Sequence, residues 1–277
     1  MKTRRNFLRA SALTIAAPLL NPFSSTASIL SKKRGPDLNI GIAGFTFAQF
    51  SYDQAIAMMQ RINVKNLSLK EMHLPLNATQ EQATALVEKS RAAGINIYTV
   101  GVIYMKDKSE VDRAFNYAKM VGVNMVIGVP EYDLLPYTEE VVKASGIRIA
   151  IHNHGPEDKR YPGPKDVYDR IKNMDEKMGL CLDIGHALRA GEDPARAIVA
   201  YKDRMFDFHI KDVTAKARDA KAIEIGRGAM DFPAVVTALR KIKYTGMCSI
   251  EYEKDMKDPM PGICESVGFF RGVMKSV

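Results

Sequence analysis

The 277-residue chain has few cysteines, no linker-like segment and no long hydrophobic run, and each absence excludes a class of protein. Three cysteines do not provide the disulfide framework that holds small secreted domains together. Cys181 and Cys248 fall within predicted strands, where we expect small core residues. No Pro/Gly/Ser-rich stretch, charge block or low-complexity run divides residues 35–277, so one domain is predicted there.

The most apolar part of the N-terminus, residues 10–20, is too short and too broken by Pro18 to span a bilayer. It follows the paired Arg4 and Arg5 and precedes the small residues 25–27, a pattern typical of a twin-arginine export signal. We therefore predict a signal peptide and linker at residues 1–34, cleavage near residue 28, and a periplasmic protein without a stable membrane anchor. The alternative is a basic N-terminus without a targeting role.

The basic charge of the chain is concentrated in this N-terminal segment. The whole sequence has a formal net charge of +8, with 40 Lys and Arg residues against 32 Asp and Glu residues. Seven of the basic residues and none of the acidic ones lie within residues 1–34, which leaves 33 against 32 in the remainder. Because nucleic-acid binding depends on a positive surface, no nucleic-acid partner is expected.

The remainder of the chain alternates short apolar segments with segments of helical spacing. One such helix is predicted at residues 79–93, where Thr79 and Gln82 form a capping box, and a polar loop is predicted at 214–228. The expected strands cover residues 38–47, 66–73, 95–104, 124–130, 147–153, 179–184, 205–211 and 247–252.

Eight strand–helix units with right-handed crossovers close most simply into a single (β/α)8 TIM barrel, an α/β fold, over residues 35–277. An open doubly wound sheet is the alternative. That arrangement is disfavoured because no Gly-x-Gly-x-x-Gly loop follows the first strand.

Four of the later strands end in side chains that can bind metal: His152, Asp183, His209 and Glu251. The carboxyl ends of parallel barrel strands share one face, and strand alternation points all four inward, so we expect them to meet. Imidazole and carboxylate ligands without thiolate favour one divalent ion, Mn²⁺, Zn²⁺ or Co²⁺. Whether His152 or His154 is the ligand from its strand is left open. The alternative is that these are buried polar residues satisfied by neighbouring backbone groups.

Further polar residues lie near the predicted strand ends and are candidates for contact with a substrate. Lys211 shares the inner face with His209, which favours a catalytic role. Lys70, His73 and His154 are candidate substrate-binding residues, although Lys70 could be solvated and His73 could only cap a loop. Other candidates are Arg227, which could bind a substrate or fix its loop against Asp231, Glu131, which could be a helix-start carboxylate, and the aromatic residues Phe45, Tyr98 and Tyr104.

Five motifs carry a resemblance to a known family: 151–155 (IHNHG), 181–186 (CLDIGH), 207–212 (DFHIKD), 226–228 (GRG) and 249–253 (SIEYE). The chain resembles the xylose isomerase-like barrel superfamily, which includes sugar epimerases, inosose dehydratases and endonuclease IV-type nucleases. The resemblance covers most of residues 38–277. It implies metal ligands at Asp183, His209 and Glu251, and a substrate-binding histidine in the reaction centre at His186.

One position departs from the pattern of the ketose 3-epimerases in this superfamily. Those enzymes have a glutamate at the position of His152, and it acts as an acid/base paired with the strand-eight glutamate. The resemblance therefore does not support a symmetric exchange between two carboxylates here. Glu251 remains the expected base, and the second base has to be found among Lys70, His73, Glu131, His154 and Lys211.

We therefore expect a metal-dependent isomerase or epimerase that moves a proton next to the carbonyl of a non-phosphorylated sugar or keto-sugar. Export and the lack of a phosphate-cradling glycine loop argue against sugar phosphates. The main alternative is a lyase or dehydratase acting on a 3-keto-glycoside or an inosose-like substrate. An endonuclease IV-type nuclease, which would need three metals and a basic groove, and a non-catalytic sugar-binding protein are further alternatives. The sugar, the reacting carbon, the metal and a homo-oligomeric state are left open.

Overall fold

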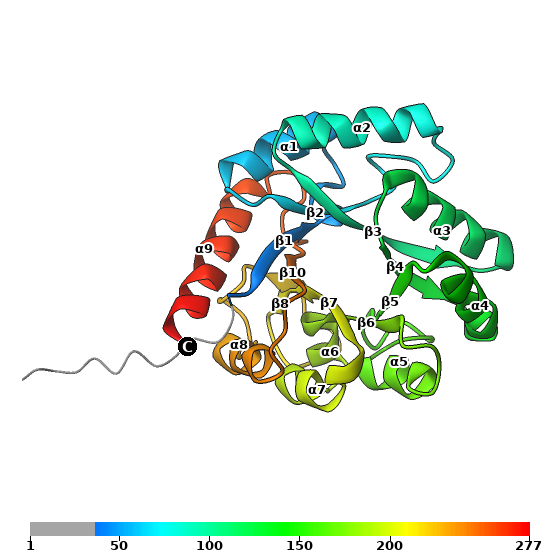
Figure 1. Ribbon diagram of the computed structural model, residues 1–277. Coiled ribbons are helices and arrows are strands. Elements are labelled where there is room, and N and C mark those ends of the chain that lie inside the picture. Colours follow the sequence, from blue (N-terminus) through cyan, green and yellow to red (C-terminus); the bar gives the residue numbers. More distant parts are fainter. Residues whose placement is uncertain (1–36) are drawn as a thin grey trace, which may run out of the picture. The chain divides into compact units, whose positions relative to one another are not determined.

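The computed structural model describes residues 37–277, so the predicted signal peptide and its boundary at residue 34 lie outside the described residues. The described chain forms a closed barrel of eight strands in which every neighbouring pair is parallel. This confirms the predicted (β/α)8 TIM barrel (Figure 1). Around the barrel the strands follow in the order β1 (Asn39–Ala43), β10 (Met247–Ile250), β7 (Met205–Ile210), β6 (Met178–Asp183), β5 (Arg148–His152), β4 (Met125–Pro130), β3 (Asn96–Met105) and β2 (Asn66–Leu69).

The helices surround the barrel (Figure 1), and α2 starts at the one cap that the sequence predicts. Thr79 and Gln82 form the predicted capping box, and Ser51 forms a second one with Gln54. The helices are α1 (Tyr52–Arg61), α2 (Gln80–Ala92), α3 (Lys108–Val121), α4 (Leu135–Ser145), α5 (Pro164–Ile171), α6 (Ile184–Arg189), α7 (Pro194–Ala200), α8 (Phe232–Lys241) and α9 (Met260–Ser276), with 3-10 turns η1 (Gly44–Phe47), η2 (Tyr132–Leu134) and η3 (Lys202–Arg204). None of the helices within residues 37–277 is long and apolar enough to cross a membrane.

The strands are buried on both faces because helices cover the outside and side chains fill the inside. Every residue of β4 and of β6 is buried. Full burial of one isoleucine or leucine side chain contributes about 1.5–3 kcal/mol, so the apolar strands provide most of the stabilisation. The polar residues that share these strands therefore require partners inside the barrel.

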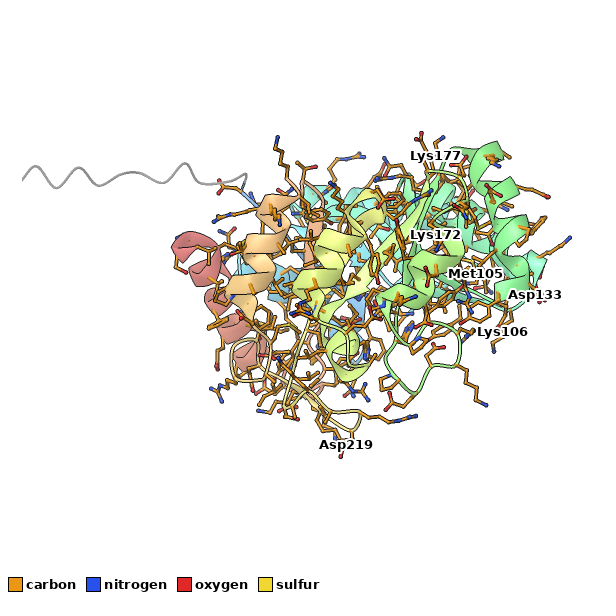
Figure 2. The ribbon with its side chains drawn as sticks, turned by 90° about the horizontal axis from the view of Figure 1, so that it is seen from below. Met105, Lys106, Asp133, Lys172, Lys177 and Asp219 are labelled. Atoms are coloured by element: carbon orange, nitrogen blue, oxygen red, sulfur yellow. The ribbon has the colours of Figure 1, made fainter. Side chains whose placement is uncertain are left out.

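The two ends of the barrel differ in their chemistry. Lys177, which directly precedes β6, and Asp219, which lies in the loop after β7, are at opposite ends of the molecule in Figure 2. At the amino-terminal end, the guanidinium of Arg204 donates hydrogen bonds to four backbone carbonyls in residues 172–178 and fixes the connection into β6. The ionisable residues predicted for the site lie at the carboxyl-terminal end.

Two local predictions were wrong. β2 ends at Leu69 rather than residue 73, and the chain then turns so that the N–H of His73 donates to the carbonyl of Lys70 at 3.0 Å. The segment 214–228 is not wholly a loop, because β8 (Asp212–Val213) pairs with β9 (Ala222–Ile223) in an antiparallel hairpin.

Helix α6 follows β6 without an intervening loop. Asp183, the last residue of β6, is its N-cap and accepts the N–H of His186.

Candidate metal centre and active site

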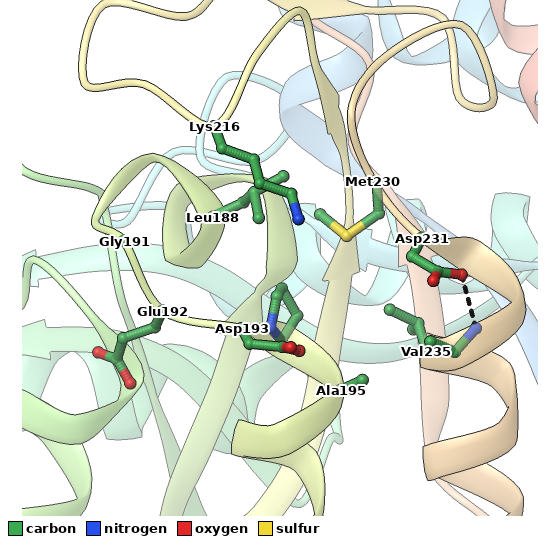
Figure 3. A pocket seen from close by; sticks show the side chains of 11 residues that line it. Leu188, Gly191, Glu192, Asp193, Ala195, Lys216, Met230, Asp231 and Val235 are labelled. Carbon is green, nitrogen blue, oxygen red and sulfur yellow. Dashed lines mark hydrogen bonds between the residues drawn. The ribbon is translucent and has the colours of Figure 1, made fainter.

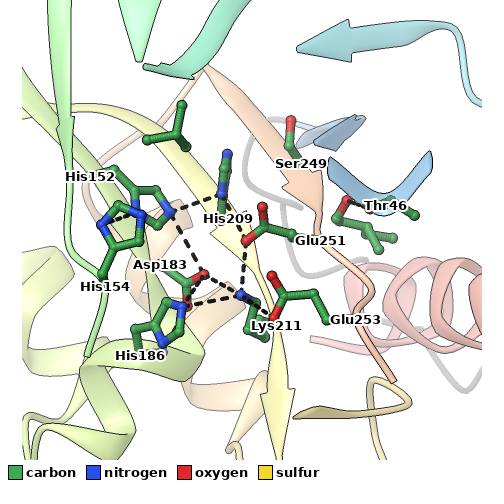
Figure 4. Close-up of polar contacts among 12 residues, drawn as sticks. Thr46, His152, His154, Asp183, His186, His209, Lys211, Ser249, Glu251 and Glu253 are labelled. Atoms are coloured by element: carbon green, nitrogen blue, oxygen red, sulfur yellow. Dashed lines mark hydrogen bonds and ion pairs between the residues drawn. The ribbon is translucent and has the colours of Figure 1, made fainter. Parts of the chain in front are cut away.

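Four buried side chains from neighbouring strands converge at the carboxyl-terminal end of the barrel (Figure 4). They come from β5, β6, β7 and the residue after β10, and one ligand atom from each lies within 4.8 Å of all the others. The members of this cluster are His152, Asp183, His209 and Glu251. His152 Nε2 lies 3.0 Å from His209 Nδ1, and His209 Nδ1 lies 3.2 Å from Glu251 Oε2. The structure thus brings together the four residues predicted as metal ligands.

The donor atoms of this cluster fit a divalent cation. Asp183 is fully buried and its Oδ2 accepts no hydrogen bond, although Lys211 Nζ lies 3.2 Å away. A buried carboxylate oxygen without a hydrogen-bond donor is costly unless cations lie beside it; the Lys211 ammonium offsets part of this cost, and a divalent ion, when bound, would offset more. Two imidazoles and two carboxylates form the ligand set of Zn²⁺, Mn²⁺ or Co²⁺. Cys181 also lies near His152 and His209, but burial raises the pKa of its thiol well above the usual value, so it is a poor ligand.

Asp183 is aimed at the cluster by its own backbone contacts. The Asn153 side chain accepts a hydrogen bond from the Asp183 N–H at 3.0 Å and donates one to the Asp183 carbonyl at 3.1 Å. Asp183 Oδ1 accepts the N–H of His186 at 2.7 Å, which leaves Oδ2 for the cluster. The sequence prediction missed Asn153, although it is the middle residue of the His-Asn-His motif.

A buried lysine neutralises the carboxylates. Lys211 Nζ lies 2.9 Å from Glu251 Oε2 and 3.2 Å from Glu253 Oε2. Burial lowers the pKa of Lys211, but the three surrounding carboxylates outweigh burial and hold that pKa well above its usual value. Burial likewise raises the pKa of Glu251, but the charges of Lys211 and His209 outweigh it and hold this pKa well below its usual value. Lys211 is therefore an ammonium and Glu251 a carboxylate.

Helix α6 approaches this lysine closely because it carries a glycine. A Cβ atom at Gly185 would come within 2.9 Å of Lys211 Cγ. The glycine therefore lets the first turn of α6 pack on the lysine stem. The same helix presents His186, whose Nε2 lies 3.3 Å from Lys211 Nζ.

The other imidazoles at the site are uncharged. Burial lowers the pKa of His154 to about 4. Burial together with neighbouring imidazoles holds the pKa of His152 well below its usual value, and burial together with the Lys211 charge does the same for His186. His186 Nδ1 lies 3.3 Å from Arg189 Nη1. Arg189 and Lys211 both only donate hydrogen bonds, so the neutral His186 ring can accept from one of them at a time. The sequence prediction missed Arg189, which also donates to Glu157 at 2.7 Å and to the carbonyl of Arg218.

An inner cavity of about 180 Å³ opens above the cluster. The metal-cluster side contributes His152 and Glu251, and residues in or just after β1, β2 and β3 supply the facing wall. Two of its aromatic residues, Phe45 and Tyr104, are 38% and 41% exposed, which makes their faces available to a ligand. The full lining is Phe45, Lys70, Val102, Tyr104, His152, His154, His186, Glu251 and Glu253. Lys70 contributes its stem, because its Nζ donates to Val102 O at 2.5 Å and pairs with Glu71.

Of the predicted contact residues, Glu131 and Lys211 lie just outside this cavity, and three others are turned away from it. His73 lies in the turn after β2, with Nε2 3.2 Å from the carbonyl of Phe50. Arg227 forms a two-pronged ion pair with Glu265, at 2.5 and 2.7 Å, and not with Asp231. Tyr98 lies deeper in the barrel, where its hydroxyl donates to Asp207 Oδ2 at 2.8 Å. Each prediction failed because a contact between residues distant in sequence turned the side chain away.

A second cavity of about 220 Å³ lies between the α6–α7 connection and α8 (Figure 3). Its two carboxylates that face each other across the cavity already cap helices: Asp193 accepts the N–H of Arg196, and Asp231 that of Ala234. Within residues 37–277, groups of metal-capable side chains occur only around His152 and His209. The barrel mouth is therefore the candidate active site.

Comparisons with known proteins agree with the barrel fold. The chain spans about two fifths of the curated relatives that it matches. One is the rhizopine catabolism protein MocC of Rhizobium meliloti, 27% identical over 132 residues, which are 42% of this chain and 40% of the relative. A solved structure of an uncharacterised protein from Parabacteroides distasonis is 27% identical, with a TM-score of 0.67 over 86% of this chain and 99% of that chain.

More distant solved structures share the fold. The IOLI protein, solved with a bound zinc atom, is 16% identical, with a TM-score of 0.73 over 86% of this chain and 98% of that chain. The 3-keto-D-glucoside 4-epimerase of E. coli is 15% identical, with a TM-score of 0.66 over 85% of this chain and 99% of that chain. Similar structures also include a sugar phosphate isomerase/epimerase and a probable dehydratase. The sequence pattern of the xylose isomerase-like TIM barrel family matches residues 43–273, and the chain therefore belongs to that family.

Proposed function

We propose that this protein is a divalent-metal-dependent sugar isomerase or epimerase, which moves a proton next to the carbonyl of a non-phosphorylated sugar or keto-sugar. One observation carries the proposal: Glu251 belongs both to the four-residue metal cluster and to the wall of the inner cavity. A carboxylate in that position can accept a proton from a substrate whose oxygens face the cluster. Family membership supports an enzyme of this kind, as do the isomerases and epimerases among the similar structures.

The residues at the site have complementary roles in proton transfer. A divalent cation, when bound, would supply Lewis-acid polarisation of a substrate oxygen. Glu251 is ionised and accepts the proton from the carbon next to the carbonyl. The ammonium of Lys211, 2.9 Å from Glu251, stabilises negative charge that develops on the substrate oxygen. The His186 ring forms a hydrogen bond with a substrate hydroxyl and thereby orients the sugar.

An epimerase also needs a second group, which returns a proton to the opposite face of the substrate carbon. In this protein that group is not a carboxylate like Glu251. Of the five candidate second bases, His73 and Glu131 do not line the inner cavity, and Lys70 is bound to Val102 O and Glu71. His154 and Lys211 remain, since His154 lines the cavity and Lys211 contacts Glu251. Because neither is a carboxylate, the two faces of the substrate carbon are treated unequally.

A lyase is the second candidate function, and the presence of His152 favours it. Elimination requires one base to remove the proton and one acid to protonate the leaving group, not two matched carboxylates. Glu251 as the base and the Lys211 ammonium as the acid meet this requirement. A 3-keto-glycoside or an inosose-like substrate would carry its leaving group in the β position.

Metal analysis and proton NMR test both candidates. We propose that the mature protein is periplasmic, so it is purified after export, and its bound metal is measured. The metal-loaded protein is then incubated in D₂O with a panel of ketoses and 3-keto-glycosides. We expect one divalent ion per chain and solvent deuterium at the carbon next to the carbonyl.

The controls separate the outcomes. An isomerase or epimerase incorporates deuterium into a sugar of unchanged composition, whereas a lyase releases a leaving group in step with exchange. Glu88→Gln, on the exposed side of α2, is the matched control for Glu251→Gln. A protein that binds no metal and exchanges no substrate proton would contradict the proposal.

A further inference from the structure

A third cavity, here called the outer cavity, adjoins the inner cavity at the barrel mouth. It has a volume of about 610 Å³ and shares two lining residues, Tyr104 and His154, with the inner cavity. The rest of its lining comes from Glu131, after β4, and from residues 157–160 in the loop after β5. The proposed reaction uses only the inner cavity, so the outer one has no assigned role.

The wall of the outer cavity is held in place by defined contacts. Arg160 Nη1 donates to Glu131 Oε1 at 2.8 Å, and Arg160 Nε lies 3.5 Å from Asp158 Oδ1. The guanidinium lies 5.1 Å from the centroid of the Tyr104 ring, within the range of a cation–π contact. The Tyr104 ring in turn lies 5.2 Å from the ring of His154. Three planar side chains, from Arg160, Tyr104 and His154, thus lie next to one another between the cavities.

The loop that carries Arg160 is also hydrogen-bonded to the barrel. The N–H of His154 donates to the carbonyl of Tyr161 at 2.9 Å, and the N–H of Gly155 donates to that of Pro162 at 3.1 Å. The buried Tyr161 hydroxyl donates to the carbonyl of Pro130 at 2.9 Å. The outer cavity is therefore a preformed feature of the structure.

The charges around the outer cavity favour a neutral, hydroxyl-rich ligand. Its lining contains three carboxylates, Glu131, Glu157 and Asp158, against two cations, Lys159 and Arg160. Arg160 is already paired with two of the carboxylates, so a phosphate or carboxylate ligand would meet repulsion. Hydroxyl groups can donate to carboxylates and accept from cations, and the face of a sugar ring packs on planar side chains.

The sizes of the two cavities indicate one ligand with two units. The inner cavity, at about 180 Å³, is smaller than the roughly 300–1,000 Å³ of cavities that bury a drug-sized ligand, whereas the outer cavity lies within that range. We propose that the substrate is a glycoside of two neutral sugar units. The reacting unit occupies the inner cavity, and the second unit lies in the outer cavity against Tyr104 and Arg160. This inference rests on the proposed function and adds the substrate class to it.

Paired ligands of one and two units test the inference. The metal-loaded full-length protein is titrated by calorimetry with the 3-keto forms of methyl α-D-glucopyranoside and maltose, and with those of methyl β-D-glucopyranoside and cellobiose. We expect the two-unit ligand of at least one pair to bind about tenfold more tightly than its one-unit partner, the gain expected from a modest additional contact surface. In Arg160→Ala the ratio of the two affinities should fall to about one.

Two further variants keep the result interpretable. Arg160→Lys retains the charge without the planar face, and we expect it to lose most of the preference as well. Arg196→Ala removes an arginine on α7 whose side chain is 90% exposed, and this control should keep the wild-type ratio. Metal content and melting temperature are measured for each variant. If Arg160→Ala does not fold, the affinity ratio of Arg160→Lys decides the test.

The outcomes distinguish this inference from the proposed function. If the one-unit and two-unit ligands of both pairs bind equally well, or if neither Arg160 variant changes the ratio, the inference is overturned and the proposed function stands. If no ligand of either size binds the metal-loaded protein, the proposed function fails together with the inference.

Discussion

Lys211 Nζ lies 3.2 Å from Asp183 Oδ2, the buried oxygen that accepts no hydrogen bond and faces the metal cluster. The ammonium and a divalent ion would therefore share one oxygen. Two unit charges of the same sign about 4 Å apart repel by about 4 kcal/mol at the effective dielectric of a protein site. A divalent ion carries twice that charge, whereas water and the carboxylates reduce the repulsion. The lysine thus opposes metal binding while it stabilises the metal-free cluster.

Lys211→Met should therefore separate metal binding from turnover. We expect metal affinity to increase at least about tenfold, because a repulsion of ~1.4 kcal/mol or more is removed. Turnover should fall because the substrate oxygen loses its cationic partner. Competition titration with a chelating dye measures the affinity, and Lys257→Met, on an exposed loop, is the control. A weaker metal site in Lys211→Met would show that the lysine supports metal binding instead.

Asp183→Asn should remove metal binding and leave the fold intact. The amide keeps an oxygen to cap the His186 N–H, which lies 2.7 Å from Asp183 Oδ1, but replaces the charged Oδ2. Addition of Zn²⁺ or Mn²⁺ should raise the melting temperature of the wild type, and we expect this rise to be lost in Asp183→Asn. In the wild type, metal at 100 times its Kd should add about 2.7 kcal/mol of stability. Asp193→Asn, a cap on α7 far from the cluster, should retain the full metal response.

Glu251→Gln should abolish most activity, because the side chain keeps its size but can no longer accept a proton. We expect turnover to fall by roughly 10²–10⁴-fold, the usual contribution of a general base, with some metal still bound. Solvent deuterium incorporation measures the loss. Near-normal exchange in this variant would make His154 or Lys211 the base.

His152→Glu tests the asymmetry of the site. It would place a second carboxylate opposite Glu251, and we expect exchange at the substrate carbon to become more symmetric between its two faces. The measurement is the deuterium content of substrate and product at early times. A variant that eliminates a leaving group as before, without added exchange, would favour the lyase.

The stability of the metal-free protein should decrease from pH 5 to pH 8 because of Asp207. Burial raises the pKa of this carboxyl to about 7, with partial compensation from the nearby His209. In the unfolded chain its pKa is near 3.9, so between about pH 4 and pH 7 the folded state holds a proton that the unfolded state has released. Stability contributed by the protonated group is full below pH 4 and is lost as the pH rises through 7.

Asp207→Asn isolates this effect, because its side chain cannot ionise. We expect wild type to lose roughly 2 kcal/mol more than the variant between pH 5 and pH 8, since one pKa unit corresponds to about 1.4 kcal/mol. Urea unfolding in EDTA at both pH values gives the difference. The exposed Asp203→Asn is the control, and equal pH dependence in Asp207→Asn and wild type would contradict the assignment.

The fold and the centre of the site could be predicted because both follow from strand pattern. Apolar alternation identifies the strands, and parallel closure brings their last residues to one face, which is how His152 and Glu251 become neighbours. The positions of His73 and Arg227 could not be predicted. They depend on where β2 ends and on an ion pair with Glu265, 38 residues away in sequence. Arg160 and Arg189 gave no signal, because their roles arise only from contacts between loops.

The metal donors all come from one contiguous half of the barrel, β5, β6, β7 and β10. The facing half supplies Phe45, Lys70, Val102 and Tyr104 to the cavity, from positions in or just after β1, β2 and β3, but no metal donor. This wall is encoded upstream of the four metal donors, in a separate stretch of the gene. Recombination or directed evolution confined to the strand ends of β1–β3 can therefore reshape one wall of the inner cavity while the metal donors stay unchanged.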